Sequence, residues 1–309
     1  MTALVEVATH LPAADEPVRA VLERTGRAAD AADYERYYGF RRVRREPGGD
    51  LTGQLRAAAL GLRTLRDRAR DVRYVVHAPT IQFTAPYPGS LAGRVARSLG
   101  LDHAVPFSLS QHACASALLA VEVCGALLAD AGDAGGLALV LAGERTFTEV
   151  AQVIHGSAVM GEGTAAVLVR AGGDRDRLLA YETRTLGEFH RSPYLPSEDE
   201  AQFQSAYPGT LVEVVREALR RAGLTVADVK VLLPHNVNRV SWLRVRRDLG
   251  LPRDGVLLDN QPELGHCFGA DPFVNYRTAC DAGRLAPGDH YVMTAAGLGA
   301  TLTAMVFRH

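Results

Sequence analysis

The chain carries one succession of sequence patterns twice, and this repeat limits its possible folds more than any other feature. The apolar strand pattern VRYVV at 72–76 has a counterpart, VKVLL, at 229–233. The segment RSLGL at 97–101 matches RDLGL at 247–251, about 150 residues later and close to half of the 309-residue chain. A repeat of this length indicates two duplicated domains packed about a pseudo-twofold axis, since solenoids repeat over about 20–50 residues.

Each copy alternates between helix and strand patterns. A helix pattern, at 55–70 and again at 211–222, precedes the apolar strand, and a polar turn, a further helix and two strands follow later. This alternation is typical of a layered α/β fold. We therefore divide the chain into an N-terminal half, 1–172, and a C-terminal half, 173–309. The segment 171–208, rich in Pro, Ser and charge, is expected to hold the crossover and any insertion that faces the substrate.

Charge, hydropathy and cysteine content exclude several classes of protein. The 34 basic and 35 acidic residues give a formal net charge of −1, so nothing indicates binding to nucleic acid or to an anionic membrane. The first residues lack the basic and apolar regions of a secretory signal, so we expect none, and no run reaches the roughly 18 uncharged apolar residues of a membrane span. Four cysteines without a CxxC pair do not resemble a disulfide framework. We expect a reduced, cytoplasmic protein.

Cys114 is the candidate nucleophile. It lies among small residues in SQHACASAL at 110–118, directly before an apolar helix pattern. The positive end of a helix dipole favours a thiolate, and the amide hydrogens there can stabilise an oxyanion. The alternative is a small, buried structural cysteine, which is the commoner role of a lone cysteine.

Two histidines are the candidate partners of this thiol. His235 follows the strand pattern at 229–233 and opens the polar cluster HNVNR, at the end of a strand where α/β sheets bind ligands. Helix capping is the structural alternative for this cluster. His266 falls near the position that matches Cys114 in the repeat, so the pseudo-symmetry brings both loops to the domain interface. A thiol and two imidazoles together are suited to covalent acyl transfer.

The ordered motifs resemble the thiolase superfamily, most closely the beta-ketoacyl-ACP synthase III family. The motifs that carry this resemblance are LP at 11–12, GFRR at 39–42, ACASAL at 113–118, GEGTAA at 161–166, PHNVN at 234–238 and GLG at 297–299. The resemblance implies a thiolase-like fold, with two pseudo-symmetric α/β halves in five layers (αβαβα), and a homodimer. The first half would carry the nucleophilic cysteine and the second half the two histidines. The substrates implied are CoA or phosphopantetheine thioesters, from acyl-CoA or an acyl carrier protein, without a cofactor or a metal.

One motif departs from the family pattern. Where type III enzymes have G-N-T-S-A-A, this chain has GHCFGA at 265–270, which is similar to the G-H-x-x-G-A of elongating ketosynthases with their Cys-His-His set. By resemblance, Cys114 carries the acyl group, while His235 and His266 bind a malonyl-type thioester and assist its decarboxylation. The amides of Cys114 and Gly299 form the oxyanion hole, and Asn238 contacts pantetheine.

The departure leaves three functions open. The favoured one is ketosynthase III-type condensation with loss of carbon dioxide, in a specialised pathway of polyketide or fatty acid type. The second is transfer of the Cys114-bound acyl group to a hydroxyl or amine without decarboxylation. A non-catalytic partner subunit is the third, and the retention of Cys114, His235 and His266 together argues against it.

Further residues are candidates for substrate contact. Phe268, next to the histidine loop, is expected to narrow the pocket, and Tyr87 is a candidate lining residue. Arg41 and Arg239 are candidates for the phosphates of coenzyme A or the acidic face of a carrier protein. A solvated surface run is the alternative interpretation for these arginines.

Overall fold

The strands of the repeat form one sheet whose order is the same on both sides of its centre. A computed structural model describes residues 2–81, 89–133, 135–146, 148 and 151–309. Among these residues, the large sheet has nine strands in the order β11-β12-β13-β10-β1-β9-β6-β4-β5. These strands are β1 (Thr2–His10), β4 (Val72–Ala78), β5 (Val105–Ser108), β6 (Leu137–Ala142), β9 (Thr164–Ala171), β10 (Arg177–Thr185), β11 (Val229–Leu233), β12 (His290–Gly297) and β13 (Thr301–Arg308).

The two halves of the sheet meet where β1 pairs with β10, at Ala3 and Arg177. Outward from that contact, β9, β6 and β4 follow on one side, and β13, β12 and β11 follow on the other. The directions repeat as well, because β6 is parallel to β4 and β12 is parallel to β11. In the second half, the counterpart of β5 is reduced to one bridge between Leu232 and Val256.

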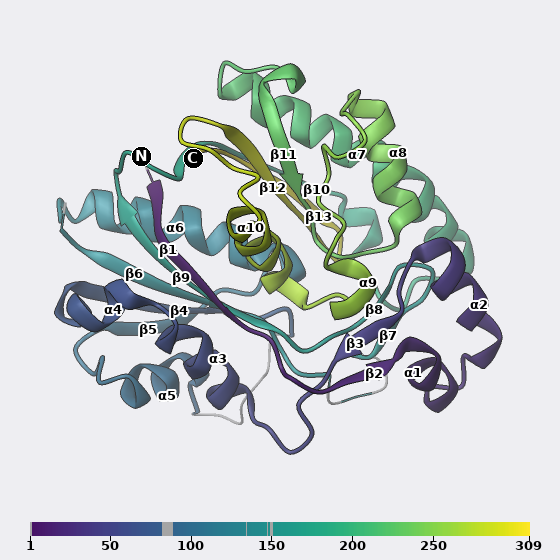
Figure 1. The fold of residues 1–309 in the computed structure, drawn as a ribbon, viewed down its shortest axis with the longest axis horizontal. Helices are drawn as coiled ribbons and strands as arrows, with labels where there is room; N and C mark the ends of the chain where they lie inside the picture. Colours follow the sequence, from purple (N-terminus) through teal and green to yellow (C-terminus); the bar gives the residue numbers. More distant parts are fainter. Residues whose placement is uncertain (1, 82–88, 134, 147, 149–150) are drawn as a thin grey trace.

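The helices form three layers around the sheet (Figure 1). Helices α6 and α10 lie in the middle, in a core that draws buried residues from both halves. Helices α3 and α5 cover the outer face of the first half, and α7 and α8 cover that of the second. The helices are α1 (Val18–Arg24), α2 (Ala31–Asp33), α3 (Leu51–Leu60), α4 (Arg63–Asp67), α5 (Leu91–Ser98), α6 (Ser116–Asp130), α7 (Ser197–Arg221), α8 (Arg239–Leu249), α9 (Gln261–Leu264) and α10 (Asp271–Asp281). The expected α/β fold with five layers is confirmed.

Short elements complete the chain. The hairpins are β2 (Asp15–Pro17) with β3 (Arg42–Arg44), and β7 (Val153–Ile154) with β8 (Ala158–Val159). The short helical turns are η1 (Ala28–Asp30), η2 (Tyr34–Tyr38), η3 (Ala69–Asp71), η4 (Ala113–Ala115), η5 (Gly187–Phe189), η6 (Val226–Asp228) and η7 (Phe268–Ala270). Helices α1 and α2 and both hairpins share a buried cluster with α7 and α8, and this cluster forms the wall beside the candidate site.

Two helix predictions need correction. The pattern at 55–70 is divided into α3, α4 and η3, since α3 ends at Leu60 and Gly61 caps it. The second helix begins 14 residues before the predicted start at 211, because α7 starts at Ser197. Pro208 lies inside α7. Three acidic residues in the first turn of α7 interact favourably with the positive end of the helix dipole. The segment 171–208 therefore contains β10, η5 and the first half of α7.

One helical stretch among the described residues is as long and apolar as a membrane span. It is Ala113–Asp130, of which 56% is buried inside the protein. This stretch is the central helix α6 with the turn before it, packed between the two halves of the sheet (Figure 1). Its position in the core explains its apolar composition.

Candidate active site

Cys114 lies in the tight turn η4, directly before the central helix α6, and its side chain is buried. The preceding residue, Ala113, has a φ of 46°, in the left-handed region. The end of β12 packs closely on this turn, since a Cβ added at Gly297 would lie 1.9 Å from the carbonyl oxygen of His112. On the other side, the hydroxyl of Thr80 donates a hydrogen bond to the sulfur of Cys114 over 3.5 Å.

His266 lies in a loop that backbone hydrogen bonds attach to the β7–β8 hairpin. Its N–H donates to the carbonyl of Val159, and its carbonyl accepts from the N–H of Gly161, each over 2.9 Å. Gly265 makes this close approach possible, because its φ is 72° and a Cβ there would lie 2.7 Å from the carbonyl oxygen of Val159. The position of His266 is therefore determined by backbone contacts on both sides.

Asp271 is a fully buried carboxylate that connects the two histidine loops. Its Oδ2 accepts hydrogen bonds from Nδ1 of His266 and from the backbone N–H of Asn236, the latter over 2.6 Å. Its Oδ1 accepts from the side-chain amide of Asn236 over 3.0 Å and from the backbone N–H of Cys267 over 2.8 Å. Four donors thus compensate the burial of one negative charge.

The surroundings of His266 favour its charged form. Burial alone lowers the pKa of His266, but the Asp271 carboxylate and the neighbouring Cys114 outweigh burial and raise this pKa to about 10. Asp271 thus bonds His266, and His266 lines the same cavity as Cys114. An imidazolium beside a sulfur stabilises the thiolate, which is the nucleophilic form of cysteine.

His235 has the opposite electrostatic character. It follows β11 and is fully buried, and burial together with the charge of His266 lowers the pKa of His235 to about 3. Its Nε2 lies 3.0 Å from the hydroxyl of Tyr207, and its carbonyl accepts from Nε1 of Trp242, also over 3.0 Å. His235 is thus a neutral imidazole in an aromatic surrounding, 6.1 Å from the ring of His266.

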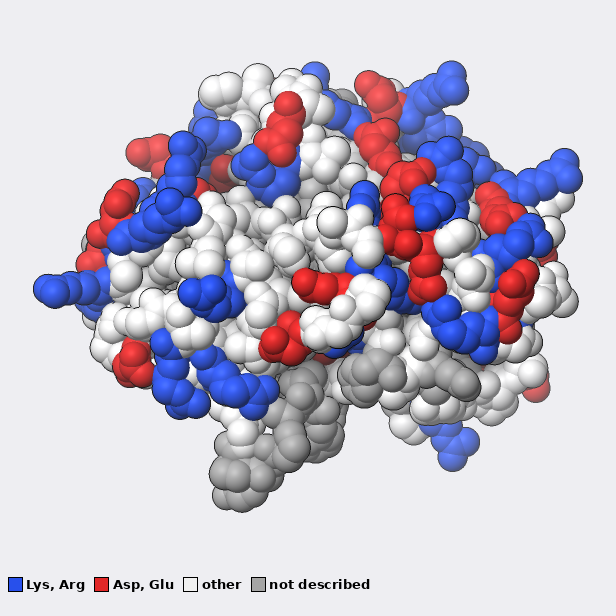
Figure 2. Space-filling view, turned by 60° about the horizontal axis from the view of Figure 1, so that its bottom comes forward, with Lys and Arg blue, Asp and Glu red and all other residues white. Residues whose placement is uncertain are grey.

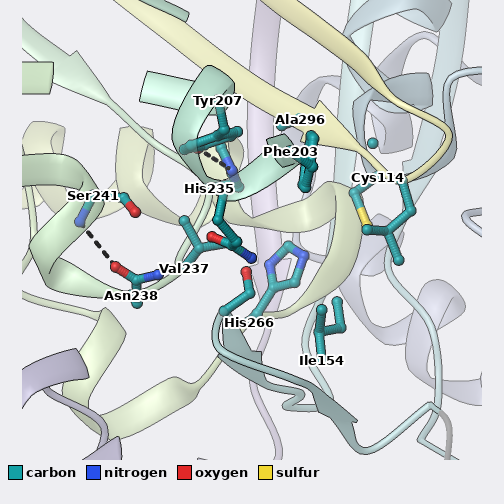
Figure 3. A pocket seen from close by; sticks show the side chains of 14 residues that line it. Cys114, Ile154, Phe203, Tyr207, His235, Val237, Asn238, Ser241, His266 and Ala296 are labelled. Carbon is teal, nitrogen blue, oxygen red and sulfur yellow. Dashed lines mark hydrogen bonds between the residues drawn. The ribbon is translucent and has the colours of Figure 1, made fainter. Parts of the chain in front are cut away.

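A narrow cavity of about 40 Å³ brings these groups together (Figure 3). Cys114, Tyr207, His235 and His266 line it, along with Ile154, Ser157, Phe203, Gln204, Val237, Asn238, Ser241, Ala296, Gly297 and Leu298. It adjoins two wider outer cavities of about 480 and 300 Å³, with which it shares lining residues. The first outer cavity is bordered by Tyr38, His155, Asn238, Ser241 and Arg244 among others, and the second by Arg27, Ser192, Tyr194 and Phe203 among others.

Asn238, Phe268 and Gly299 have different relations to this cavity. Asn238 lines it, and the same side chain caps α8 by accepting from the N–H of Ser241 over 2.8 Å. Phe268 is buried beside the ring of His266, with 6.1 Å between the ring centroids, rather than among the lining residues. Gly299 directly follows the lining segment 296–298 and has a φ of 123°.

The candidate basic contacts lie outside the cavities. Arg41 forms an ion pair with Glu263, and Arg239 donates to the carbonyl of Arg36 over 3.2 Å. The arginine that borders the wider outer cavity is Arg244. Basic and acidic side chains are interspersed on the face shown in Figure 2. The candidate lining residue Tyr87 lies outside the described residues.

Three residues of the site were not predicted from the sequence. Asp271 follows His266 by five residues, and a carboxylate so close to a candidate histidine was a signal for this pair. Tyr207 precedes a proline and a glycine, a pattern typical of a turn rather than of a helix that lines a pocket. Thr80 lies in none of the motifs that indicated the site. Cys267, beside His266, is buried, and burial raises its pKa well above the ordinary value, which disfavours its thiolate.

Comparisons with known proteins identify the family of this chain. The family described as 3-oxoacyl-[acyl-carrier-protein (ACP)] synthase III C terminal matches residues 219–309. The beta-ketoacyl-[acyl-carrier-protein] synthase III 2 of Streptomyces coelicolor is 30% identical over 273 residues, covering 85% of this chain and 81% of that protein. The chain belongs to the beta-ketoacyl-ACP synthase III family. The synthase III of Pseudomonas aeruginosa is also 30% identical, over 84% of this chain and 82% of its own length.

Solved structures show the same fold. The acyltransferase ChlB3 superposes with a TM-score of 0.85 at 22% identity, covering 99% of this chain and 97% of that one. Synthase III from Aquifex aeolicus superposes with a TM-score of 0.79 at 20% identity, over the whole of both chains. As a member of the synthase III family with a thiolase-like fold, the protein is an acyltransferase.

Proposed function

We propose that this synthase III family member carries an acyl group on Cys114 and passes it to a hydroxyl or amine acceptor without decarboxylation. The observation that carries this proposal is that Cys114 and His266 line one cavity while Asp271 bonds the ring of His266. A nucleophile, an imidazole and a carboxylate in this order are the groups that acyl transfer through a covalent intermediate requires. An imidazole held by a carboxylate can also take the proton of a hydroxyl or amine acceptor, which supports the second of the two enzymatic functions that the sequence left open.

In the first half-reaction, the Cys114 thiolate attacks the carbonyl carbon of an acyl thioester. The carbon–sulfur bond to the leaving thiol breaks, a new bond to Cys114 forms, and the leaving thiolate takes a proton from the His266 imidazolium. The backbone N–H groups of Cys114 and Gly299 are the proposed donors to the oxyanion of the intermediate. His266 ends this step as a neutral imidazole.

In the second half-reaction, the neutral His266 acts as the base. It removes the proton of the acceptor hydroxyl or amine as the acceptor attacks the acyl carbon, and the bond to Cys114 breaks to regenerate the thiolate. Asp271, hydrogen-bonded to the other ring nitrogen, stabilises the imidazolium that forms. The thiolate–imidazolium pair returns to its starting state with no net oxidation or reduction.

The donor is proposed to be acyl-CoA or an acyl carrier protein. The wider outer cavity adjoins the catalytic cavity at Asn238 and Ser241 and carries Arg244 at its border. A pantetheine arm could pass Asn238 while Arg244 faces the phosphate at its far end. The proposed steps use the thioester substrates and this chain's own side chains, without a resident cofactor or metal.

Decarboxylative condensation is the second candidate function. It is favoured by the relatives that are 30% identical, which are named beta-ketoacyl-ACP synthases. In that reaction, ring N–H groups of His235 and His266 would bind the carbonyl oxygen of a malonyl-type thioester. Carbon dioxide would leave, and the resulting carbanion would attack the acyl-Cys114 carbon to form a carbon–carbon bond, while the carbon–sulfur bond breaks and regenerates the Cys114 thiolate.

The test is the intact-protein mass after incubation with a panel of acyl-CoA and acyl-carrier thioesters, with Cys114→Ala beside the wild type. We expect one acyl adduct that depends on Cys114. The adduct is then chased with malonyl-CoA or with hydroxyl and amine acceptors, while carbon dioxide and the acylated products are measured. An adduct that persists in Cys114→Ala would exclude the nucleophile, and a carbon–carbon product with carbon dioxide would favour condensation instead.

A further inference from the structure

The hydroxyl of Tyr207 lies beside Nε2 of His235, and both residues line the catalytic cavity. Tyr207 comes from α7 and is buried, and its Oη lies 3.0 Å from Nε2 of His235. Both side chains line the same cavity as Cys114 and His266 (Figure 3). The direction of this hydrogen bond therefore determines whether Nε2 of His235 can donate a hydrogen bond to a substrate.

The direction of the bond follows from its surroundings. Burial keeps His235 neutral, with a pKa lowered to about 3, and burial also raises the pKa of Tyr207, so the phenol keeps its proton. A neutral imidazole has one nitrogen that donates and one that accepts. Within the described part of the chain, Nε2 of His235 is the one hydrogen-bond partner of the Tyr207 hydroxyl. Since a buried hydroxyl is rarely left without an acceptor, we assign Tyr207 as the donor and Nε2 as the acceptor, which places the ring proton on the buried Nδ1.

This direction has a chemical consequence for malonyl-type thioesters. When such a thioester loses carbon dioxide, the carbon–carbon bond to the carboxylate breaks and its electron pair forms an enolate. The negative charge of the enolate develops on the thioester oxygen, and the carbanion carbon then takes a proton from solvent or attacks an acyl carbon. Ring N–H groups directed at that oxygen stabilise the charge. An Nε2 that accepts from Tyr207 cannot donate to it.

We propose that Tyr207 is a specificity-determining residue, whose hydroxyl holds His235 as a hydrogen-bond acceptor and thereby disfavours decarboxylation of malonyl-type thioesters. This inference rests on the proposed function, because it explains why a site with two histidines would transfer acyl groups to oxygen or nitrogen. Tyr207 acts through His235 and is a positioning residue. The hydroxyl oxygen of Tyr207 alone is proposed to disfavour decarboxylation, and a single substitution removes it.

The test compares wild type with Tyr207→Phe, which keeps the ring and removes only the hydroxyl. Both proteins receive malonyl-CoA labelled in its free carboxyl group, and the released carbon dioxide is measured. We expect the rate of release to rise at least about tenfold in Tyr207→Phe, since one donor to an oxyanion is worth about 100-fold or more elsewhere. Formation of acyl-Cys114 from acyl-CoA is measured in parallel and should persist.

The matched control is Tyr276→Phe. It also removes a buried hydroxyl, one that donates to Asp176 over 2.7 Å, on a residue outside the lining of the catalytic cavity. We expect this control to leave carbon dioxide release unchanged. A rise in the control as large as that in Tyr207→Phe would contradict a specific role for Tyr207.

A second measurement reads the histidine directly. In protein with ¹⁵N-labelled histidine, the Nε2 signal of His235, identified by its loss in His235→Gln, should be that of an unprotonated nitrogen in wild type. Tyr207→Phe should shift this signal toward that of a protonated nitrogen. An Nε2 that is already protonated in wild type, or a signal unchanged by the substitution, would overturn the inference.

The outcomes separate this inference from the proposed function. If wild type forms a carbon–carbon product from malonyl-CoA, the proposed function fails, but the ratio of variant to wild-type carbon dioxide release still tests Tyr207. Equal release from both proteins, including no release from either, or a slower release from Tyr207→Phe, would overturn the inference whatever wild type does.

Discussion

Replacing Asp271 by asparagine tests the chain of groups on which the proposed chemistry depends. The substitution keeps the shape of the side chain and removes its charge. Each carboxylate oxygen accepts from two donors, so the amide nitrogen of asparagine must face two donors in either orientation. At about 1–3 kcal/mol for each donor left without an acceptor, the free energy of unfolding should fall by about 2–6 kcal/mol.

The kinetic effect follows from the charge of His266. The difference between its pKa of about 10 and the ordinary 6.5 corresponds to about 5 kcal/mol of imidazolium stabilisation, to which Asp271 is the largest favourable contributor. Complete loss of that stabilisation from the transition state would slow acylation about 3000-fold. Because part of the stabilisation comes from Cys114, we expect acylation to slow by about 100- to 1000-fold.

The assay is single-turnover formation of acyl-Cys114, followed by intact-protein mass with a thioester that labels wild type. Asp176→Asn is the matched control, since Asp176 is also buried and also bonds a histidine, His309, over 2.7 Å at a site away from the catalytic cavity. It should lose stability but acylate at the wild-type rate while folded. If folded Asp271→Asn acylates within about threefold of wild type, our account of His266 is wrong.

Three further predictions concern pH, packing and thiol reactivity. The pKa of His235 in the folded protein, about 3, lies below the ordinary 6.5, so the stability gained by burying the neutral ring is complete above pH 6.5 and is lost as the pH falls toward 3. Chemical denaturation should show that the free energy of unfolding falls by about 2 kcal/mol by pH 5, a loss absent from His235→Gln. An equal loss in both proteins would contradict this prediction. Gly161→Ala should lower the free energy of unfolding by about 3 kcal/mol or more, because its Cβ would lie 1.9 Å from the carbonyl oxygen of Leu264, beside the His266 loop. The control is Gly209→Ala in α7, where a Cβ meets nothing within 4 Å. Equal stability of the two variants would refute the packing argument. Iodoacetamide should label Cys114 first, as burial raises the pKa of Cys124, Cys267 and Cys280; labelling of wild type and Cys114→Ala at the same rate would show that another thiol is the more reactive.

The sequence alone determined the fold class and the set of candidate residues. The repeat of about 150 residues predicts the two halves of the sheet, because strand and helix periodicities depend on local sequence, and a repeated pattern therefore gives a repeated set of strands and helices. The motifs around Cys114, His235 and His266 are short and ordered, and the structure brings all three side chains to one cavity. Their chemical roles stay predictions until the adduct is measured.

Only the tertiary structure decided how these groups are paired. The motifs cannot show that Asp271 bonds His266 or that Tyr207, 28 residues before His235, hydrogen-bonds with its Nε2. Both contacts depend on which face of a helix meets the loop beside it, and this depends on the packing of α7 and α10 against the sheet. The pKa values of the two histidines diverge for the same reason, since burial acts on both while the carboxylate reaches only one.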